Sequence, residues 1–213
     1  MVQLITATDR VYRYVKGRII DGQLPGGDMV TEGQIASETQ VSRTPVREAF
    51  LRLQTEGYLH LYPKRGAVIS PITPEESGEV FDARLLLESH AAAHICRQPE
   101  RVRLALCDTL ETNLDAQDAA IESGDLDAYS SMDADFHHAV VEAGGNRLLF
   151  GFFCTIRERH QRLIFASVGG DHRSARAFVA GHRELLEQLR AGNAAGYQSA
   201  LTKHLTLAED ILK

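Results

Sequence analysis

Two short helical patterns, separated by a tight break, constrain the fold of this chain more than any other part of its sequence. Thr31 and Gln34 have the spacing of a capping box, so a helix is expected to begin there. The pattern breaks after Thr39, and either Ser42 or Thr44 is expected to cap a second helix. Two helices joined by so short a break are typical of a helix-turn-helix.

The second of these helices has an apolar face and a polar face. Four residues recur at helical spacing and predict the buried face: Val46, Ala49, Phe50 and Leu53. Arg43, Thr44 and Arg47 are left to point elsewhere at the leading end. They could be ordinary solvated residues, but the helix dipole disfavours cations there, and a phosphate or a base edge would offset that cost. Arginine at this position suits the major groove of DNA, where it pairs with guanine in bidentate fashion.

A hairpin with a basic tip is predicted directly downstream. Residues 58–62 and 67–69 are rich in β-branched and aromatic side chains, which is typical of strands. Pro63-Lys64-Arg65-Gly66 joins them and supplies the basic tip. A helix-turn-helix followed by such a hairpin is a winged helix, and it indicates nucleic-acid binding.

Residues 1–70 resemble the DNA-binding domain of GntR-family transcriptional regulators. The segments that carry the resemblance are 19–27, 41–49, 52–59 and Arg65-Gly66. It implies contacts to bases or phosphates from Arg43, Thr44 and Arg47. It also implies that the tip of the wing, Lys64-Arg65-Gly66, binds DNA and approaches the minor groove.

The sequence departs from the family pattern at two positions. Gly33 stands where many relatives place a DNA-contacting arginine, which predicts fewer base contacts or an altered operator. Gln40 stands where the turn usually has glycine, which predicts a non-glycine residue in a turn that often favours positive φ.

The net charge of −6 does not argue against DNA binding, because it is unevenly distributed. Residues 1–70 carry nine Lys and Arg against seven Asp and Glu, whereas the rest of the chain carries 14 against 22. The field that meets phosphate comes from the local patch rather than from the whole chain.

Composition also argues against several other classes of protein. The longest apolar stretch, 148–156, is interrupted by Gly151 and is too short to span a bilayer. The first residues lack the basic region and apolar core of a signal peptide, so the protein is expected in the cytoplasm. The three cysteines have no C-x-x-C spacing and are expected to be buried reduced thiols: Cys96, Cys107 and Cys154.

A domain boundary is predicted where Pro71 ends the last wing strand. Thr73 as N-cap, Pro74 at the first helical position and Glu76 at the third predict a new helix. We therefore assign residues 1–70 to a winged helix-turn-helix domain, 71–76 to a linker and 77–213 to a second domain.

The second domain is predicted to be an antiparallel all-α bundle of six helices, which makes the whole chain mainly α. The expected helices lie near residues 75–97, 99–123, 126–143, 147–166, 174–191 and 194–212. Each break contains glycine or an N-cap residue, as at Gly169-Gly170-Asp171.

Histidines inside this bundle indicate a metal site. His182 and His204 have apolar neighbours one turn away on both sides, so both rings should point into the core. His137 has the same surroundings, and Asp133 lies one turn before it. Three imidazoles and one carboxylate from three helices are a plausible set of ligands for a transition metal. The alternative is that each is a hydrogen-bonded packing residue, and His90 and His160 pass the same neighbour test.

The second domain resembles the FCD effector-binding domain of the FadR branch of GntR regulators, and six helices are closest to its VanR-type subgroup. In metal-containing members an Asp-x-x-x-His helix is joined by two later histidines, which implies that Asp133, His137, His182 and His204 hold a divalent transition metal. Zinc is the first expectation, with nickel or manganese as alternatives. The resemblance also implies that Arg84 binds the carboxylate of a small effector, although a salt bridge to Glu88 is an equal alternative.

Together these features predict a DNA-binding transcriptional regulator rather than an enzyme. We expect a homodimer that binds a palindromic operator, acts as a repressor and responds to a small organic acid. The alternative is a metal-dependent hydrolase or lyase, since an open metal site can activate water. An enzyme of that kind would not explain the winged helix-turn-helix.

Overall fold

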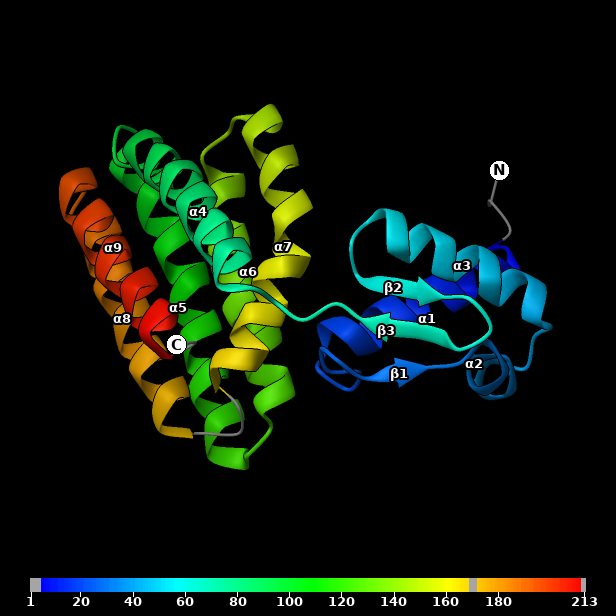
Figure 1. Cartoon of the computed structure of the whole chain (residues 1–213). Helices are drawn as coiled ribbons and strands as arrows, with labels where there is room; N and C mark the ends of the chain where they lie inside the picture. The colour runs from blue at the N-terminus through cyan, green and yellow to red at the C-terminus, as the bar shows by residue number, and fades with distance from the viewer. Residues whose placement is uncertain (1–4, 169–171, 212–213) are drawn as a thin grey trace. The chain divides into compact units, whose positions relative to one another are not determined.

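The computed structural model describes residues 5–168 and 172–211, and the chain divides between Ile72 and Thr73 into two compact units (Figure 1). The described residues form nine helices and three short strands, so the mainly α prediction is confirmed. The expected break at Gly169-Gly170-Asp171 and the expected helix end at Leu212 lie outside the described residues.

The first unit is a winged helix-turn-helix. Its helices are α1 (Ala7–Ile20), α2 (Glu32–Thr39) and α3 (Arg43–Thr55). The wing hairpin is formed by β2 (Leu59–Tyr62) and β3 (Gly66–Ile69), which pair antiparallel with Leu59 opposite Ile69. A third strand, β1 (Met29–Val30), pairs with the other edge of β3 and was not expected, because two residues carry no periodicity.

A side-chain cap begins α2, and a residue with positive φ ends this helix before the turn. Thr31 Oγ1 accepts a hydrogen bond from the Gln34 amide at 3.1 Å, as the capping-box spacing predicts. Gln40 ends α2 at φ 55°, which confirms the expected non-glycine residue with positive φ. Ser42, not Thr44, is the N-cap of α3, and its side chain makes no capping hydrogen bond to the described residues.

The second unit contains six described helices whose positions agree closely with the expected ones. They are α4 (Pro74–Ile95), α5 (Glu100–Ser123), α6 (Leu126–Ala143), α7 (Arg147–Val168), α8 (His172–Arg190) and α9 (Ala194–Ile211). The predicted linker 71–76 is too long, because α4 already begins at Pro74. Thr73 Oγ1 accepts from the Glu76 amide at 3.1 Å, so this cap starts the helix inside the assigned linker.

The six helices pack around a polar centre. α4 packs against α6, α7 and α9, while α5 packs against α6 and α8, and α8 packs against α9. In Figure 1, α6 lies within the bundle beside α4 and α5. This arrangement brings polar residues of α4, α6, α7, α8 and α9 to one buried region. None of the described helices is long and apolar enough to cross a membrane.

The cysteines differ from the expected burial. All three are free thiols, but only Cys107 is buried, whereas Cys96 is half-buried and Cys154 is exposed. Cys154 lies on α7, where Leu148 and Phe152 are also exposed. Apolar residues on this helix therefore do not indicate burial.

Candidate DNA interface and candidate metal centre

The leading end of α3 presents the three residues expected to contact DNA. Arg43, Thr44 and Arg47 are all exposed. The opposite face is fixed in the core of the first unit, where Val46 and Phe50 are fully buried. The apolar spacing of the sequence therefore determines which polar side chains face outward at the start of this helix.

Gly33, at the start of α2, lies next to Arg43. A Cβ atom added to Gly33 would be 3.6 Å from Arg43 Nη2. Gly33 and Arg43 therefore lie in the same part of the surface, so the departure from the family pattern is next to the first arginine of α3.

Arg52, farther along α3, serves the fold of the first unit. Its guanidinium carbon lies 3.7 Å from the centre of the Tyr12 ring, and its Nη1 is 3.3 Å from Asp9 Oδ1. Tyr12 and Asp9 belong to α1, so Arg52 joins α3 to α1.

The tip of the wing exposes Lys64 and Arg65. Lys64 has φ 62°, an uncommon conformation for a residue with a side chain. Gly66 has φ 118°, and a Cβ there would lie 2.4 Å from the Val30 carbonyl oxygen. Glycine is therefore required at this position because β3 passes close to the end of β1.

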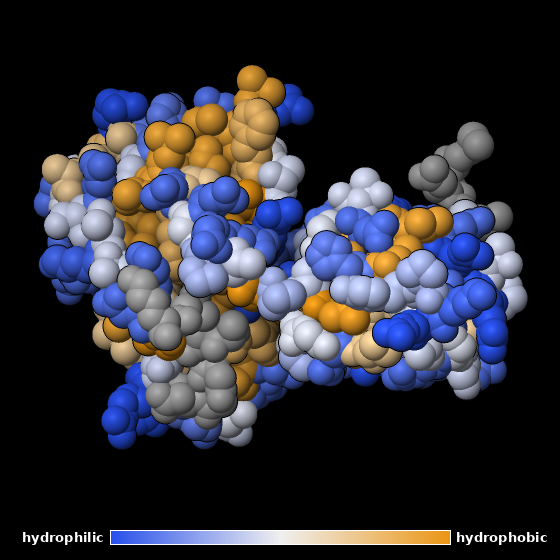
Figure 2. Space-filling model, viewed as in Figure 1, coloured by the Kyte–Doolittle hydropathy of each residue, from blue (hydrophilic) through white to orange (hydrophobic). Residues whose placement is uncertain are grey.

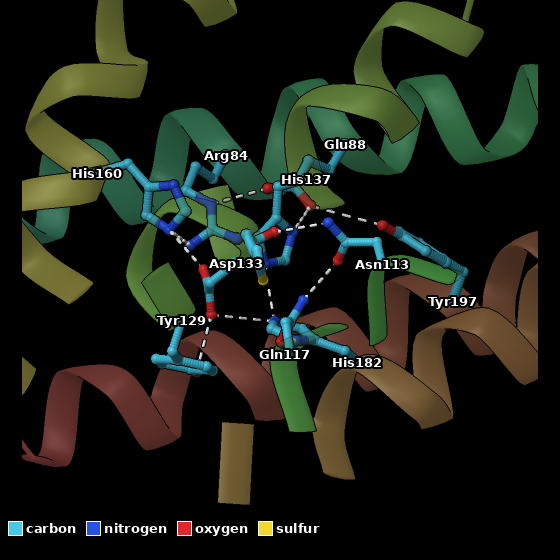
Figure 3. Close-up of polar contacts among 11 residues, drawn as sticks. Arg84, Glu88, Asn113, Gln117, Tyr129, Asp133, His137, His160, His182 and Tyr197 are labelled. Carbon is cyan, nitrogen blue, oxygen red and sulfur yellow. Dashed lines mark hydrogen bonds and ion pairs between the residues drawn. The ribbon is translucent and has the colours of Figure 1, made fainter. Parts of the chain in front are cut away.

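Buried polar side chains form the centre of the second unit (Figure 3). Asp133 and His137 lie on α6, His182 on α8 and His204 on α9, and each is at most 5% exposed. Ring nitrogens of the three histidines lie within 4.8 Å of one another. The four residues expected to bind metal are thus in one place, although they are far apart in sequence.

A fifth residue, His160 on α7, joins this cluster. It forms a second group of possible ligands with Asp133 and His137. Its Nε2 lies 3.9 Å from Asp133 Oδ2 and 2.6 Å from Arg84 Nη1. The sequence indicated the burial of His160 only through its apolar neighbours. By contrast, His90, which has similar apolar neighbours in the sequence, is exposed, so it lies outside the core.

Hydrogen bonds at the Nδ1 atoms of His137 and His182 determine which nitrogen of each ring carries the proton. His137 Nδ1 lies 2.8 Å from Glu88 Oε2, and His182 Nδ1 lies 3.0 Å from Gln117 Oε1. Gln117 uses its Nε2 to donate to Asn113 Oδ1 at 2.7 Å, so its Oε1 is the acceptor for His182. Both histidines therefore carry their proton on Nδ1.

The Nε2 atoms of His137 and His182 consequently face each other with their lone pairs. Burial lowers the pKa of His137 and of His182 well below its usual value, so both rings are neutral. Their Nε2 atoms are only 3.1 Å apart, and neither has a proton to share. Asp133 Oδ1 is 3.4 Å from His182 Nε2. Two lone pairs and a carboxylate oxygen in contact repel one another unless a cation lies among them.

Burial also shifts the other groups of the cluster. It raises the pKa of Asp133 to about 7, against the opposing effect of the Arg84 charge, and Tyr129 donates a hydrogen bond to Asp133 Oδ1 at 3.1 Å. Burial lowers the pKa of His204 to about 3, so its ring is neutral as well. His204 Nδ1 is buried and finds no hydrogen-bond partner among the described residues.

Arg84 forms the salt bridge to Glu88 that was one of its two expected roles, and the binding of an effector carboxylate stays a prediction. Its Nε donates to Glu88 Oε1 at 2.8 Å, so the alternative salt bridge is present. Its Nη1 donates to His160 Nε2, but Nη2 is buried without a hydrogen-bond partner in the described part of the chain. Glu88 therefore holds both Arg84 and His137, a second role that the sequence spacing did not reveal.

A small cavity, with about 10 Å³ open to a water-sized molecule, lies beside the cluster. Its lining residues come from α4, α6, α7, α8 and α9: Phe81, Arg84, Asp133, His160, Leu163, Ile164, Phe178, His204 and Ala208. Its lining therefore combines charged and polar residues of the cluster with apolar residues of the surrounding helices.

Comparison with known proteins identifies both units. Residues 7–69 match the family described as bacterial regulatory proteins, gntR family, and residues 79–207 match the FCD domain. The HTH-type transcriptional repressor RspR of Escherichia coli K12 is 25% identical over 197 residues, 92% of this chain and 84% of RspR. The gluconate operon transcriptional repressor of Bacillus licheniformis is 33% identical over 138 residues, 63% of this chain and 54% of that protein.

A solved structure shows the same fold over nearly the whole chain. E. coli McbR/YncC has a TM-score of 0.77 and 21% identity, and the match covers 98% of each chain. The family matches and the names of the relatives indicate a regulator and not an enzyme. The chain therefore belongs to the gntR family of bacterial regulatory proteins, as a DNA-binding transcriptional regulator whose winged helix-turn-helix is followed by an FCD domain.

Proposed function

We propose that this regulator is a dimeric repressor whose affinity for a palindromic operator is controlled by a small carboxylic acid bound beside a metal ion. The observation that carries the proposal is the contact between the two unprotonated nitrogens of His137 and His182. A cation is the simplest group that stabilises such a pair, and the acid would then bind at the open coordination positions of the ion.

The distances in the cluster suit a small divalent ion. Ligand atoms about 2.0–2.1 Å from zinc at tetrahedral angles are roughly 3.3 Å apart. The corresponding distances are 3.1 Å between His137 and His182 and 3.4 Å between His182 and Asp133. Together with His204 these residues would hold the ion, with zinc the first expectation and nickel or manganese as alternatives. Such an ion supplies positive charge that attracts a carboxylate.

Two buried hydrogen-bond donors support binding of a carboxylate. Arg84 Nη1 is always a donor, so His160 Nε2 must accept, and burial keeps the His160 pKa well below its usual value. The neutral ring therefore carries its proton on Nδ1, which is buried without a partner in the described chain, as is Arg84 Nη2. A carboxylate, which only accepts hydrogen bonds, satisfies two such donors together.

An exposed apolar surface on the second unit supports a dimer. Leu86 on α4 and Leu148 and Phe152 on α7 are 72%, 77% and 63% exposed, and α4 packs against α7. Figure 2 shows hydrophobic residues gathered over these helices. A patch of this kind on a protein that reads a two-fold operator suits an interface between two copies.

Two further assignments rest on the relatives and on the fold. Repression is supported by two relatives that are named repressors. The VanR-type subgroup stays a prediction, supported by the six described helices of the second unit.

Calorimetric titration tests the proposed site. The metal-free protein should bind one zinc ion per chain, and the metal-loaded protein should then bind a small carboxylic acid. Both reactions should weaken together in a His182→Ala variant, whereas His90→Ala serves as the control because His90 is exposed. Absence of metal binding by the wild type would show that the cluster is a packing arrangement.

A further inference from the structure

We infer that Gly181 on α8 is a positioning residue for the metal centre, because it leaves the space in which the His204 side chain lies. This role rests on the proposed function, since His204 is one of the proposed metal ligands. Gly181 has no side chain that could touch an ion, so it would act on metal affinity only through the position of its neighbour.

The backbone of α8 does not require glycine at position 181. Gly181 lies in the interior of this helix, with a φ outside the left-handed region. Glycine in the interior of a helix is less favourable than alanine, because it loses more conformational freedom on folding. The reason for glycine at this position therefore has to be what packs against it.

The His204 side chain lies directly against Gly181. A Cβ atom added to Gly181 would be 2.7 Å from His204 Nδ1, 3.5 Å from its Cγ and 3.7 Å from its Cβ. Apart from the neighbouring residues of α8, the three atoms nearest to that position all belong to His204. A carbon atom 2.7 Å from a ring nitrogen is well inside van der Waals contact. Alanine at position 181 is therefore accommodated only if the His204 ring or the helix moves.

Two other residues on the same face of α8 lie beside the His204 ring. Phe178 and His182 are three residues before and one residue after Gly181, so the three share one face of the helix. The centre of the His204 ring is 5.7 Å from the centre of the Phe178 ring and 4.6 Å from that of His182. One face of α8 therefore carries the proposed ligand His182 and also supports the proposed ligand His204.

Packing matters more for His204 than for the other two histidines of the centre. The Nδ1 atoms of His137 and His182 both have hydrogen-bond partners, whereas His204 Nδ1 is buried without one in the described part of the chain. Metal ligands have to lie within a few tenths of an ångström of their proper distance from the ion. A ring that is displaced by a new methyl group should therefore bind the ion poorly.

A double-mutant cycle between positions 181 and 204 tests this role, with zinc affinity measured by competition with a chelator. Gly181→Ala should lower zinc affinity about tenfold or more, and His204→Ala should lower it at least as much. Once His204 is alanine there is no ring to displace, so the addition of Gly181→Ala should cause no further loss. The visible absorption of cobalt(II), bound in place of zinc, should shift in Gly181→Ala toward that of His204→Ala, because it reports on the ligands of the ion.

Two controls separate the crowding of His204 from a general effect on the helix. Gly78→Ala changes another helical glycine of the same unit, at which a Cβ meets nothing within 4 Å, and its zinc affinity should equal that of the wild type. In metal-free protein that carries His204→Ala, Gly181→Ala should raise the urea midpoint, since only the better helix propensity of alanine remains. The double variant therefore tests the role even if Gly181→Ala alone does not fold.

The outcomes distinguish the role of Gly181 from the metal centre itself. Wild-type protein that binds no zinc overturns the proposed function. Zinc binding that is equally tight in the wild type and in Gly181→Ala overturns the positioning role and leaves the metal centre in place. An equal loss from Gly181→Ala with and without the His204 side chain also overturns it, because alanine would then disturb α8 rather than His204.

Discussion

His137 and His182 face each other in the core of the FCD domain with 3.1 Å between their Nε2 atoms, while their Nδ1 atoms donate to Glu88 and Gln117. Because each outer hydrogen bond fixes the proton on Nδ1, both inner nitrogens are acceptors. The pair comes from α6 and α8, so any ion between these nitrogens would join two helices of the bundle.

Removal of Gln117 should weaken metal binding although Gln117 would not touch the ion. Gln117→Leu removes the acceptor that holds the His182 proton on Nδ1, so His182 loses its fixed orientation. Metal affinity should fall about tenfold or more. Competition with a chromogenic chelator measures this. Asn113→Ala removes the outer partner of Gln117 and a hydrogen bond to the Met132 carbonyl oxygen, neither of which contacts a histidine ring, and should have a smaller effect; the reverse order would contradict the account.

Arg47→Ala should weaken specific operator binding without changing the fold or the metal content. Loss of a bidentate contact to guanine costs about 1–3 kcal/mol, which is roughly tenfold or more in affinity. Fluorescence anisotropy with an operator duplex checks this. Arg101→Ala is the matched control, because Arg101 is an exposed arginine on α5 of the other unit. Unchanged affinity of Arg47→Ala would refute the role given to α3.

Gly66→Ala should destabilise the first unit because its Cβ would lie 2.4 Å from the Val30 oxygen at a φ of 118°. The cost should be about 1–3 kcal/mol in the free energy of unfolding. Urea denaturation measures it. Gly78→Ala is the control, since a Cβ on this helical glycine meets nothing within 4 Å, and it should be neutral or slightly stabilising. Equal stabilities of the two variants would be inconsistent with the structure.

Phe152→Glu should convert the proposed dimer into a monomer. Phe152 is 63% exposed in the single chain, and a carboxylate there would be buried against the partner's apolar surface without a counter-charge. Light scattering after size-exclusion chromatography gives the mass. Val102→Glu is the control, because Val102 is 46% exposed on α5, a helix that carries none of the three patch residues. A Phe152→Glu variant that stays dimeric would place the interface elsewhere.

The metal-free protein should lose stability as the pH falls below about 6.5. Burial lowers the pKa of four histidines, so the unfolded chain binds their protons first: His137, His160, His182 and His204. Burial raises the pKa of Glu88 and Asp133, which acts in the opposite direction because these carboxyls bind protons first in the folded state. Four groups outweigh two, and each excess proton lowers the free energy of unfolding by roughly 1.4 kcal/mol per pH unit. Urea midpoints at about pH 7.5 and 5.5 test this; equal or greater stability at the lower pH would contradict it.

Much of the fold follows from signals that act within one or two turns of helix. The caps at Thr31 and Thr73 start their helices where the spacing predicts, because a cap depends only on nearby amides. Asp133 and His137 share a face of α6 for the same reason. These features do not depend on how the helices pack.

Other parts of the site depend on packing and could not be read from spacing. His160 and His90 have similar apolar neighbours, yet His160 is buried beside Arg84 and His90 is exposed. Leu86, one of the apolar neighbours of His90, is itself 72% exposed, so apolar periodicity does not distinguish a core from an interface. The hydrogen bond between Glu88 and His137 likewise depends on how α4 packs against α6.

The most direct test of the central claim is the operator affinity of the dimer with and without a bound acid, in metal-loaded and metal-free protein. If the metal and the acid form one control site, the carboxylic acid found to bind the metal-loaded protein should change operator affinity at least several-fold in that protein and should have no effect after removal of the metal by a chelator. Restoring zinc should restore the response. An operator affinity that is the same in all four states would contradict the account.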